Sequence, residues 1–168
     1  MIAIHIAERS GLPLKIAAKV DPVDHDYFEK TIRPLLARPR VEFIGEISDA
    51  QKSEFLSNAF ALLVPIDWPE PFGLVMIEAM ACGAPVIAFN RGAVPELIEH
   101  GVTGFVVEDE MSAVGAVRHV SRLSRTVIRR RFEERFTARR MTKEYLALYR
   151  DLLGGTMLRP RIAPVSPR

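Results

Sequence analysis

The chain has 168 residues, of which 48% are hydrophobic and 26% are charged, and its formal net charge is +2. This composition is typical of a globular protein with a hydrophobic core, and the length suits one compact domain. The small net charge indicates no general attraction to nucleic acid. The single cysteine, Cys82, excludes an intrachain disulfide. No stretch reaches the roughly 18 apolar residues of a membrane span, and the N-terminus lacks the features of a signal peptide, so we expect a cytoplasmic protein.

Helices and strands alternate along the predicted chain. Helices are predicted at 2–10, 24–37, 48–59, 73–82 and 94–100, and strands at 14–20, 41–45, 60–66, 85–89 and 104–108. The helix at 48–59 begins with a capping box formed by Ser48 and Gln51. From 111 to about 153 the pattern is helical, with breaks near Ser124 and Thr137.

The strands are apolar on both faces, which is typical of a parallel sheet covered by helices on both sides. We therefore predict an α/β fold over residues 1–153. Residues 154–168 combine glycine, proline and basic residues without a period, so we expect a disordered tail there.

The segment EPFGLVMIEAM, residues 70–80, places Glu78 inside a helix that is apolar nearly all round. A charged side chain in such a helix needs a partner. Because helical side chains lean toward the N-terminus, Glu78 is expected to reach toward the loop 65–72. In parallel α/β sheets, ligands bind beyond the carboxyl ends of the strands, which is where this loop lies.

The start of this helix is a candidate anion site, because its first N–H groups have no partner within the helix. The backbone N–H groups of Phe72, Gly73 and Leu74 are the expected donors. Glu78 would be repelled by phosphates, so we expect it to accept hydrogen bonds from neutral hydroxyls. The alternative is structural: Glu78 accepts from loop N–H groups, and Glu70 is an exposed loop residue.

The stretch EPFGLVMIEAMACGAPVIAFNRGAVPELIEHGVTGFVVED, residues 70–109, resembles the C-terminal donor-binding domain of glycosyltransferase family 4. This is a family of retaining nucleotide-sugar transferases with the GT-B fold, in which the donor-binding domain is Rossmann-like. The similarity extends back through 41–73 and forward through 130–153. Glu70 and Glu78, with seven residues between them, match the E-x7-E motif of the family.

The resemblance implies a role for each matched residue. Glu70 is the catalytic-site acid that binds hydroxyls of the transferred sugar, and Glu78 binds the ribose hydroxyls. The N–H groups of Phe72, Gly73 and Leu74 bind the sugar and the diphosphate. The implied donor is a UDP-sugar or a GDP-sugar, transferred with retention of configuration, and neither a metal nor a further cofactor is expected. The leaving group would be stabilised electrostatically.

The sequence also departs from the family. Its C-terminal domain begins with a strand and a loop carrying an arginine and a lysine that bind the diphosphate, whereas this chain starts at the following helix. The resemblance therefore implies a domain truncated at its N-terminus, with a gap in the sheet between 14–20 and 60–66. We expect no robust activity without a polypeptide that supplies the acceptor domain. The alternative is a non-catalytic module that binds a nucleotide sugar or another protein.

Several other features leave two interpretations open. The segment 90–98 matches the family, and its Pro95 and Glu96 start a short helix that is either structural or part of the site rim. The basic helices after residue 117 present either a solvated face or a peripheral contact with the anionic inner membrane. Their apolar side would favour self-association; its residues are Met141, Tyr145, Leu148 and Leu152. No histidine matches the family's site, so the four are interpreted as surface or packing residues: His5, His25, His100 and His119.

Overall fold

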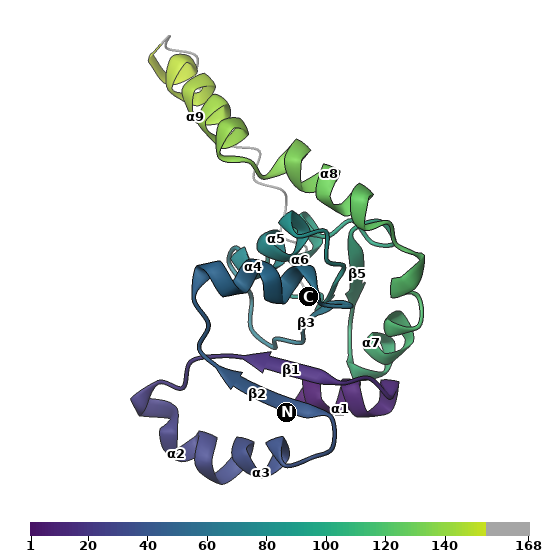
Figure 1. Cartoon of the computed structure of the whole chain (residues 1–168). Coiled ribbons are helices and arrows are strands. Elements are labelled where there is room, and N and C mark those ends of the chain that lie inside the picture. The colour runs from purple at the N-terminus through teal and green to yellow at the C-terminus, as the bar shows by residue number, and fades with distance from the viewer. Residues whose placement is uncertain (154–168) are drawn as a thin grey trace, which may run out of the picture. The chain divides into compact units, whose positions relative to one another are not determined.

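The computed structural model describes residues 1–153, in which helices and parallel strands alternate as the sequence predicts (Figure 1). The predicted tail, 154–168, lies outside the described residues. The chain divides into two units, Met1–Glu133 and Glu134–Arg168. The α/β class is confirmed, with parallel sheets flanked by helices.

Five strands form two separate parallel sheets rather than one. β1 (Leu14–Ala17) pairs with β2 (Val41–Gly45), and β4 (Val86–Phe89) lies between β3 (Leu62–Val64) and β5 (Gly104–Val107). In the described residues no strand pairing joins β1 to β3. The interruption between these two strands, predicted from the strand order, is therefore present.

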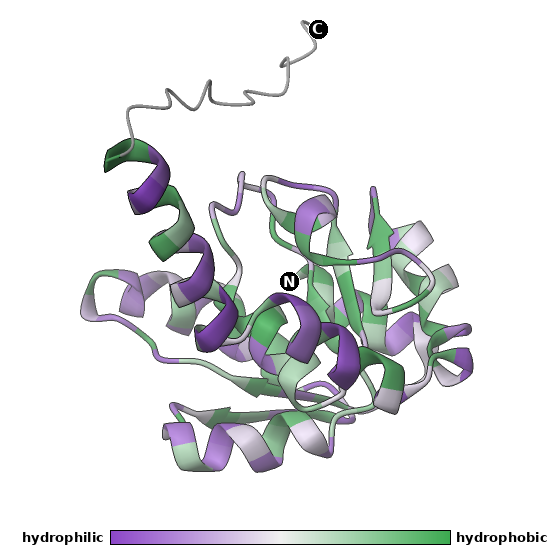
Figure 2. Ribbon diagram, turned by 90° about the horizontal axis from the view of Figure 1, so that it is seen from above, coloured by the Kyte–Doolittle hydropathy of each residue, from purple (hydrophilic) through white to green (hydrophobic). Residues whose placement is uncertain are grey.

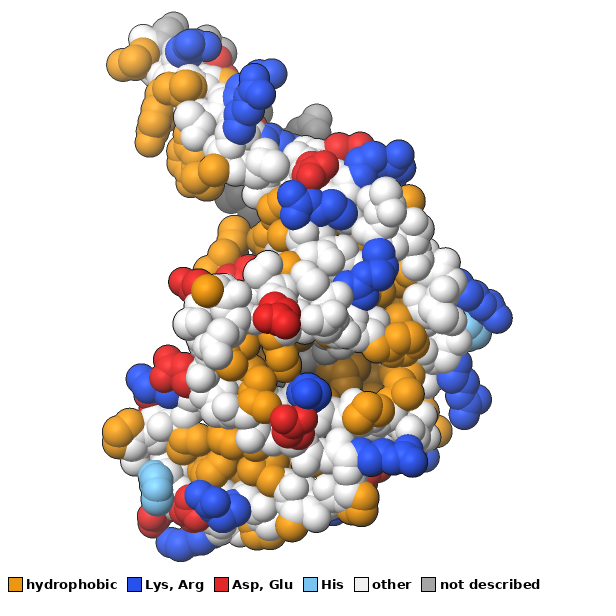
Figure 3. Space-filling model, in the orientation of Figure 1, with side chains coloured by type: hydrophobic (Ala, Val, Ile, Leu, Met, Phe, Trp, Pro, Cys, Tyr) orange, Lys and Arg blue, Asp and Glu red, His pale blue; other side chains and the backbone are white. Residues whose placement is uncertain are grey.

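The strands that border this interruption are less buried than the strand at the centre of the three-stranded sheet. All four residues of β4, which has a strand on each side, are buried, while β1 has none buried and β3 only Val64. β3 is nevertheless made of Leu62, Leu63 and Val64, a composition suited to a central strand. Figure 3 shows a hollow at the centre of one face, with hydrophobic side chains around it. The strand is also shorter than the predicted 60–66, since Pro65 has no N–H to donate to a ladder.

Two helices pack directly on the three-stranded sheet. α5 (Leu74–Ala81) packs on β3 and β4 and contacts α4 (Asp49–Ser57), whereas α7 (Glu110–Val117) packs on β4 and β5. α1 (Ile2–Ser10) contacts both α7 and β1, so it links the two sheets. A core of buried side chains joins α1, β4, β5 and α7; it comprises Ile6, Ile87, Phe89, Val107, Ala113, Val114, Ala116 and Val120. Much of the strand ribbon in Figure 2 is coloured as hydrophobic.

Local signals explain several helix boundaries. The capping box predicted for α4 is present, because the Ser48 side chain accepts from the Gln51 N–H while Gln51 accepts from the Ser48 N–H. The helix predicted at 24–37 is present, but its form changes along the stretch: η1 (Pro22–Asp24) is a 3₁₀ turn, α2 (His25–Tyr27) is α-helical, η2 (Phe28–Ile32) is a wider π-helical turn and α3 (Arg33–Leu36) is α-helical again. Pro34 lacks the N–H that would bond four residues back, which accounts for this irregularity.

Two helical predictions need correction. α5 is not buried all round, because Leu74 and Val75 are 65% and 41% exposed, respectively, while Met76, Ala79 and Met80 are fully buried. α6 (Val94–Leu97) ends before His100, which instead forms a β-bridge with Gly104.

The remaining helices are η3 (Val120–Arg122), α8 (Arg125–Arg135) and α9 (Ala138–Leu153), with breaks where the sequence predicts them. α9 belongs to the second unit and has no buried residue. Its apolar side chains are exposed along one side and its basic side chains along the other (Figure 3). None of the helices within 1–153 is long and apolar enough to cross a membrane.

Candidate functional site

The loop between β3 and α5 folds around the side chain of Glu70. One carboxylate oxygen, Oε1, accepts hydrogen bonds from the N–H of Gly73 at 2.9 Å and the N–H of Phe72 at 3.3 Å. The chain thus brings Glu70 together with two of the three N–H groups predicted to bind an anion. In this state both donors are directed at the carboxylate of the same loop.

Gly73 allows this turn because its φ of +78° is in the left-handed region, which few residues other than glycine adopt. It is the residue immediately before α5, so the left-handed backbone marks the transition from loop to helix. The predicted donor Leu74 follows as the first helical residue, and its side chain is largely exposed. The first N–H groups of a helix have no intrahelical acceptor, so this end of α5 can receive a negative group.

A second loop, from β4 to α6, supports the backbone of Glu70. The N–H of Ala93 donates to the Glu70 carbonyl oxygen at 2.8 Å. Gly92 lies so close that a Cβ there would stand 2.5 Å from the backbone nitrogen of Glu70. Arg91 Nε donates to Asp67 Oδ1 at 3.3 Å and thereby links the same two loops. The segment 90–98 therefore contacts the candidate site directly, which adds a supporting role to the structural role of its helix.

Glu78 has a partner that the sequence did not reveal. Lys52 on α4 places its Nζ 3.0 Å from Glu78 Oε1 and 3.2 Å from Asp49 Oδ1. Hydrogen bonding to Glu78, followed by that to Asp49, raises the pKa of Lys52 above its ordinary value. The Glu78 side chain is 40% exposed, so it lies at the surface between two helices rather than in the core. The only sequence signal for this ion pair was the need of a carboxylate in an apolar helix for a partner.

The two glutamates of the motif therefore occupy different surroundings on one short stretch of chain. Glu70 is held by backbone N–H groups, and Glu78 by a lysine ammonium. Both are carboxylates with a second oxygen that can accept further hydrogen bonds. Neutral hydroxyl donors are the groups best suited to such oxygens, since phosphate oxygens would be repelled.

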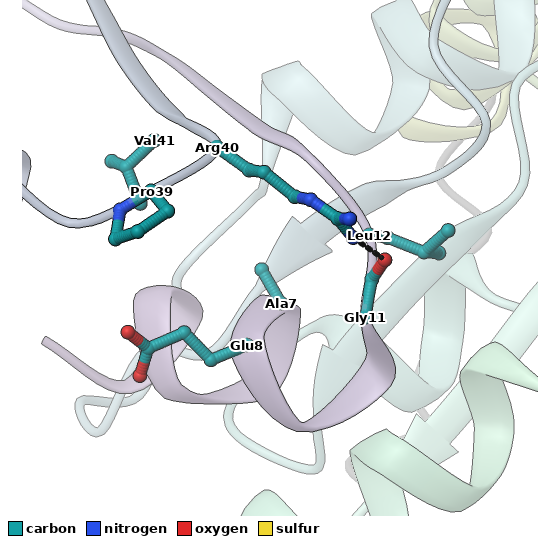
Figure 4. A pocket seen from close by; sticks show the side chains of 7 residues that line it. All are labelled: Ala7, Glu8, Gly11, Leu12, Pro39, Arg40 and Val41. Carbon is teal, nitrogen blue, oxygen red and sulfur yellow. Dashed lines mark hydrogen bonds between the residues drawn. The ribbon is translucent and has the colours of Figure 1, made fainter.

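Two cavities lie elsewhere. One, of about 300 Å³, lies between α1 and the start of β2, where Arg40 Nη1 donates to the Gly11 carbonyl oxygen at 2.7 Å (Figure 4). The other, of about 580 Å³, lies between α4, the end of α5 and α8, and includes Cys82 and Arg125. Arg125 is engaged in bonds to the carbonyl oxygens of Ser57 and Ala59. Neither cavity includes a residue of the predicted site.

The histidines have structural contacts away from the E-x7-E segment. His5 and His25 lie near Glu110 and Glu29, respectively, and the Nδ1 of His100 accepts from the Val106 N–H. His119 packs near the Phe105 ring. Within residues 1–153 no group of three or more acidic, histidine or cysteine side chains is placed to hold a metal ion.

Comparisons with known proteins cover most of the first unit. Residues 5–137 match the family model described as "Glycosyl transferases group 1". The chain is 31% identical over 130 residues to N-acetyl-alpha-D-glucosaminyl L-malate synthase of Bacillus anthracis, covering 73% of this chain and 33% of that protein. It is 34% identical over 92 residues to phosphatidyl-myo-inositol mannosyltransferase of Mycobacterium leprae, covering 55% and 25%, respectively.

Solved structures with the GT-B fold show the same arrangement. Sucrose-phosphate synthase from Thermosynechococcus elongatus is similar with a TM-score of 0.72 and 27% identity, covering 92% of this chain and 42% of that one. AviGT4, a glycosyltransferase involved in avilamycin A biosynthesis, is similar with a TM-score of 0.70 and 25% identity, covering 92% and 47%, respectively. The chain therefore spans between a quarter and a half of the length of these four proteins.

Proposed function

The chain belongs to the glycosyl transferases group 1 family, and from that premise we propose that it is the donor-binding part of a retaining, family 4-type glycosyltransferase. The observation that carries the proposal is the start of α5. There an acid and two backbone N–H groups meet at the carboxyl end of a parallel strand, the edge of the sheet where α/β proteins bind ligands.

Each residue of the motif has a chemical task in this proposal. Glu70 accepts hydrogen bonds from hydroxyls of the transferred sugar. The N–H groups of Phe72, Gly73 and Leu74 bind the sugar and the diphosphate, supported by the positive end of the α5 dipole. Glu78 accepts from the ribose hydroxyls. The donor is a UDP-sugar or a GDP-sugar.

The proposed transfer proceeds with retention of the anomeric configuration and without a metal ion. A phosphate oxygen of the donor assists deprotonation of the incoming hydroxyl, so no protein base is required. The protein stabilises the negative charge that develops on the departing diphosphate through fixed N–H groups, which cost no reorganisation during the reaction. Glu70 orients the sugar over these donors.

We further propose that the chain acts together with another polypeptide that supplies the acceptor domain. The interruption between β1 and β3 supports this part of the proposal. The basic and apolar sides of α9 suit a peripheral contact with an anionic membrane surface. Incubating the isolated chain with a nucleotide sugar tests its dependence on a second polypeptide, and brisk turnover or hydrolysis would contradict it.

Direct binding measurements test the donor site. Isothermal titration with UDP, GDP and their sugar derivatives is expected to show binding of one nucleotide series. Replacing Glu78 with alanine should weaken it roughly 10- to 100-fold, because a hydrogen bond to a charged group contributes about 1.5–3 kcal/mol. Glu54→Ala, which removes an exposed acid from neighbouring α4, is the matched control. Equal affinity in the wild type and Glu78→Ala would remove Glu78 from the site.

The second candidate is a non-catalytic module that binds a nucleotide sugar or another protein. The interruption of the sheet supports this candidate as much as it supports the enzyme. A sheet that is interrupted beside the candidate site would allow ligand binding without forming a full catalytic site. Co-purification separates the two candidates. A second polypeptide that restores sugar transfer supports the enzyme, and a chain that binds nucleotide but never gains transfer activity supports the module.

A further inference from the structure

Lys52 is held more tightly than the other lysines for which an ion pair is found in the described residues. Its side chain is 32% exposed, compared with 60% for Lys15 and Lys19 and 77% for Lys30. Asp49, three residues earlier on α4, holds the ammonium from one side at 3.2 Å, and Glu78 on α5 holds it from the other at 3.0 Å. The lysine thus bridges two helices.

The bridge uses only one oxygen of Glu78. Lys52 Nζ contacts Oε1, and within residues 1–153 no hydrogen-bond or ion-pair partner is found for Oε2. The helix around this carboxylate is apolar, with Ile77 and Ala79 buried on either side in the sequence. A glutamate side chain has three rotatable bonds, so an unpaired Glu78 would sample several orientations.

We infer that Lys52 is a positioning residue for nucleotide recognition: it fixes Oε1 of Glu78 so that Oε2 is presented to the ribose hydroxyls. This inference rests on the proposed function, and it adds a residue outside the E-x7-E motif to the donor site. Asp49 contributes by orienting the ammonium toward α5. Because Lys52 acts through Glu78, its effect is confined to ligands that carry the hydroxyls which Glu78 binds.

A purely structural bridge between α4 and α5 would behave differently. Its loss would weaken all nucleotides alike, or none. The discriminating quantity is therefore the ratio of the affinities for a nucleoside diphosphate and for its 2′,3′-dideoxy analogue. This ratio does not respond to a general loss of folded protein or to a change in phosphate binding.

The experiment compares the wild type with Lys52→Met, Lys52→Arg, Glu78→Gln and the double variant Lys52→Met/Glu78→Gln. The probes are UDP, GDP and their 2′,3′-dideoxy analogues, measured by titration calorimetry. The wild type is expected to prefer the ribose form roughly tenfold or more, since one hydrogen bond to a charged group is worth about 1.5–3 kcal/mol. Lys52→Met should bring this ratio close to one, and Lys52→Arg should retain most of it. Lys52→Met should have no further effect on the ratio in the Glu78→Gln background.

The outcomes distinguish a failure of the proposed function from a failure of the inference about Lys52. If the wild type binds neither UDP nor GDP, the proposed function itself is overturned. If it binds one of them and Lys52→Met leaves the ribose-to-dideoxy ratio unchanged, only the inference about Lys52 is overturned. An additive effect of the two substitutions on the ratio would also overturn it, because residues that act through one another are not additive.

Discussion

Gly92 provides the sharpest test of how the two loops support Glu70. Its φ is +55°, and a Cβ at this position would stand 2.5 Å from the Glu70 nitrogen and 2.8 Å from the Pro69 carbonyl carbon. Alanine there combines two costs. The left-handed backbone costs about 1–2 kcal/mol for a residue with a Cβ, and forcing extra atoms into a packed contact costs about 1–3 kcal/mol. Since the neighbouring atoms are backbone, they have little freedom to move aside.

Gly92→Ala is therefore expected to lower the free energy of unfolding by roughly 2–5 kcal/mol, a large share of the 5–15 kcal/mol typical of a domain. Gly101→Ala is the matched control: its φ is +77°, yet no atom lies within 4 Å of the added Cβ, so only the backbone cost of about 1–2 kcal/mol remains. Urea unfolding followed by far-ultraviolet circular dichroism measures both. Equal losses in the two variants would refute the close packing of Gly92 against Glu70.

Two further predictions concern hydrogen bonds away from the site. The Ser112 N–H donates to Asp109 and holds the pKa of that carboxyl below its usual 3.8. Because the pKa of Asp109 is lower in the folded state than in the unfolded state, the stabilisation is fully present above the unfolded-state pKa. It is lost as the pH falls through the folded-state pKa. Urea unfolding from about pH 5 to pH 3 should therefore show a smaller loss of stability for Asp109→Asn than for the wild type, and parallel curves would contradict this. Thr103 is fully buried and its Oγ1 accepts from the Glu99 N–H at 2.9 Å, so Thr103→Val should cost about 1–3 kcal/mol by removing the acceptor of this hydrogen bond. Thr103→Ser keeps the hydroxyl, and a loss as large as that of Thr103→Val would contradict the role of this bond.

Features encoded by a few neighbouring residues were predictable from the sequence. The capping box at Ser48 and the strand 41–45 were predicted as observed, because a cap and a strand pattern depend on side chains only a few positions apart. The alternation of helices and apolar strands predicted the α/β class for the same reason. The interruption between β1 and β3 followed from the resemblance and the order of strands in doubly wound sheets.

What escaped prediction depends on distant contacts. Lys52 and Glu78 are 26 positions apart, and their ion pair exists only because α4 packs against α5. The exposure of Leu74 and Val75 likewise depends on which elements leave that side of α5 uncovered. The hydrogen bonds from Phe72 and Gly73 to Glu70 are an exception, because they are local, and an acid two and three positions before these N–H groups was a usable signal for them.

The contact of Glu70 with the N–H groups of Phe72 and Gly73 also affects the free energy with which an anion can bind there. A negative charge already accepts from these donors, so at the proposed site an incoming diphosphate would compete with a group of the protein itself. Binding then becomes an exchange of one anion for another, and the net gain is smaller than the number of new hydrogen bonds suggests. Because the same hydrogen bonds already order the loop, little conformational entropy would be lost in that exchange.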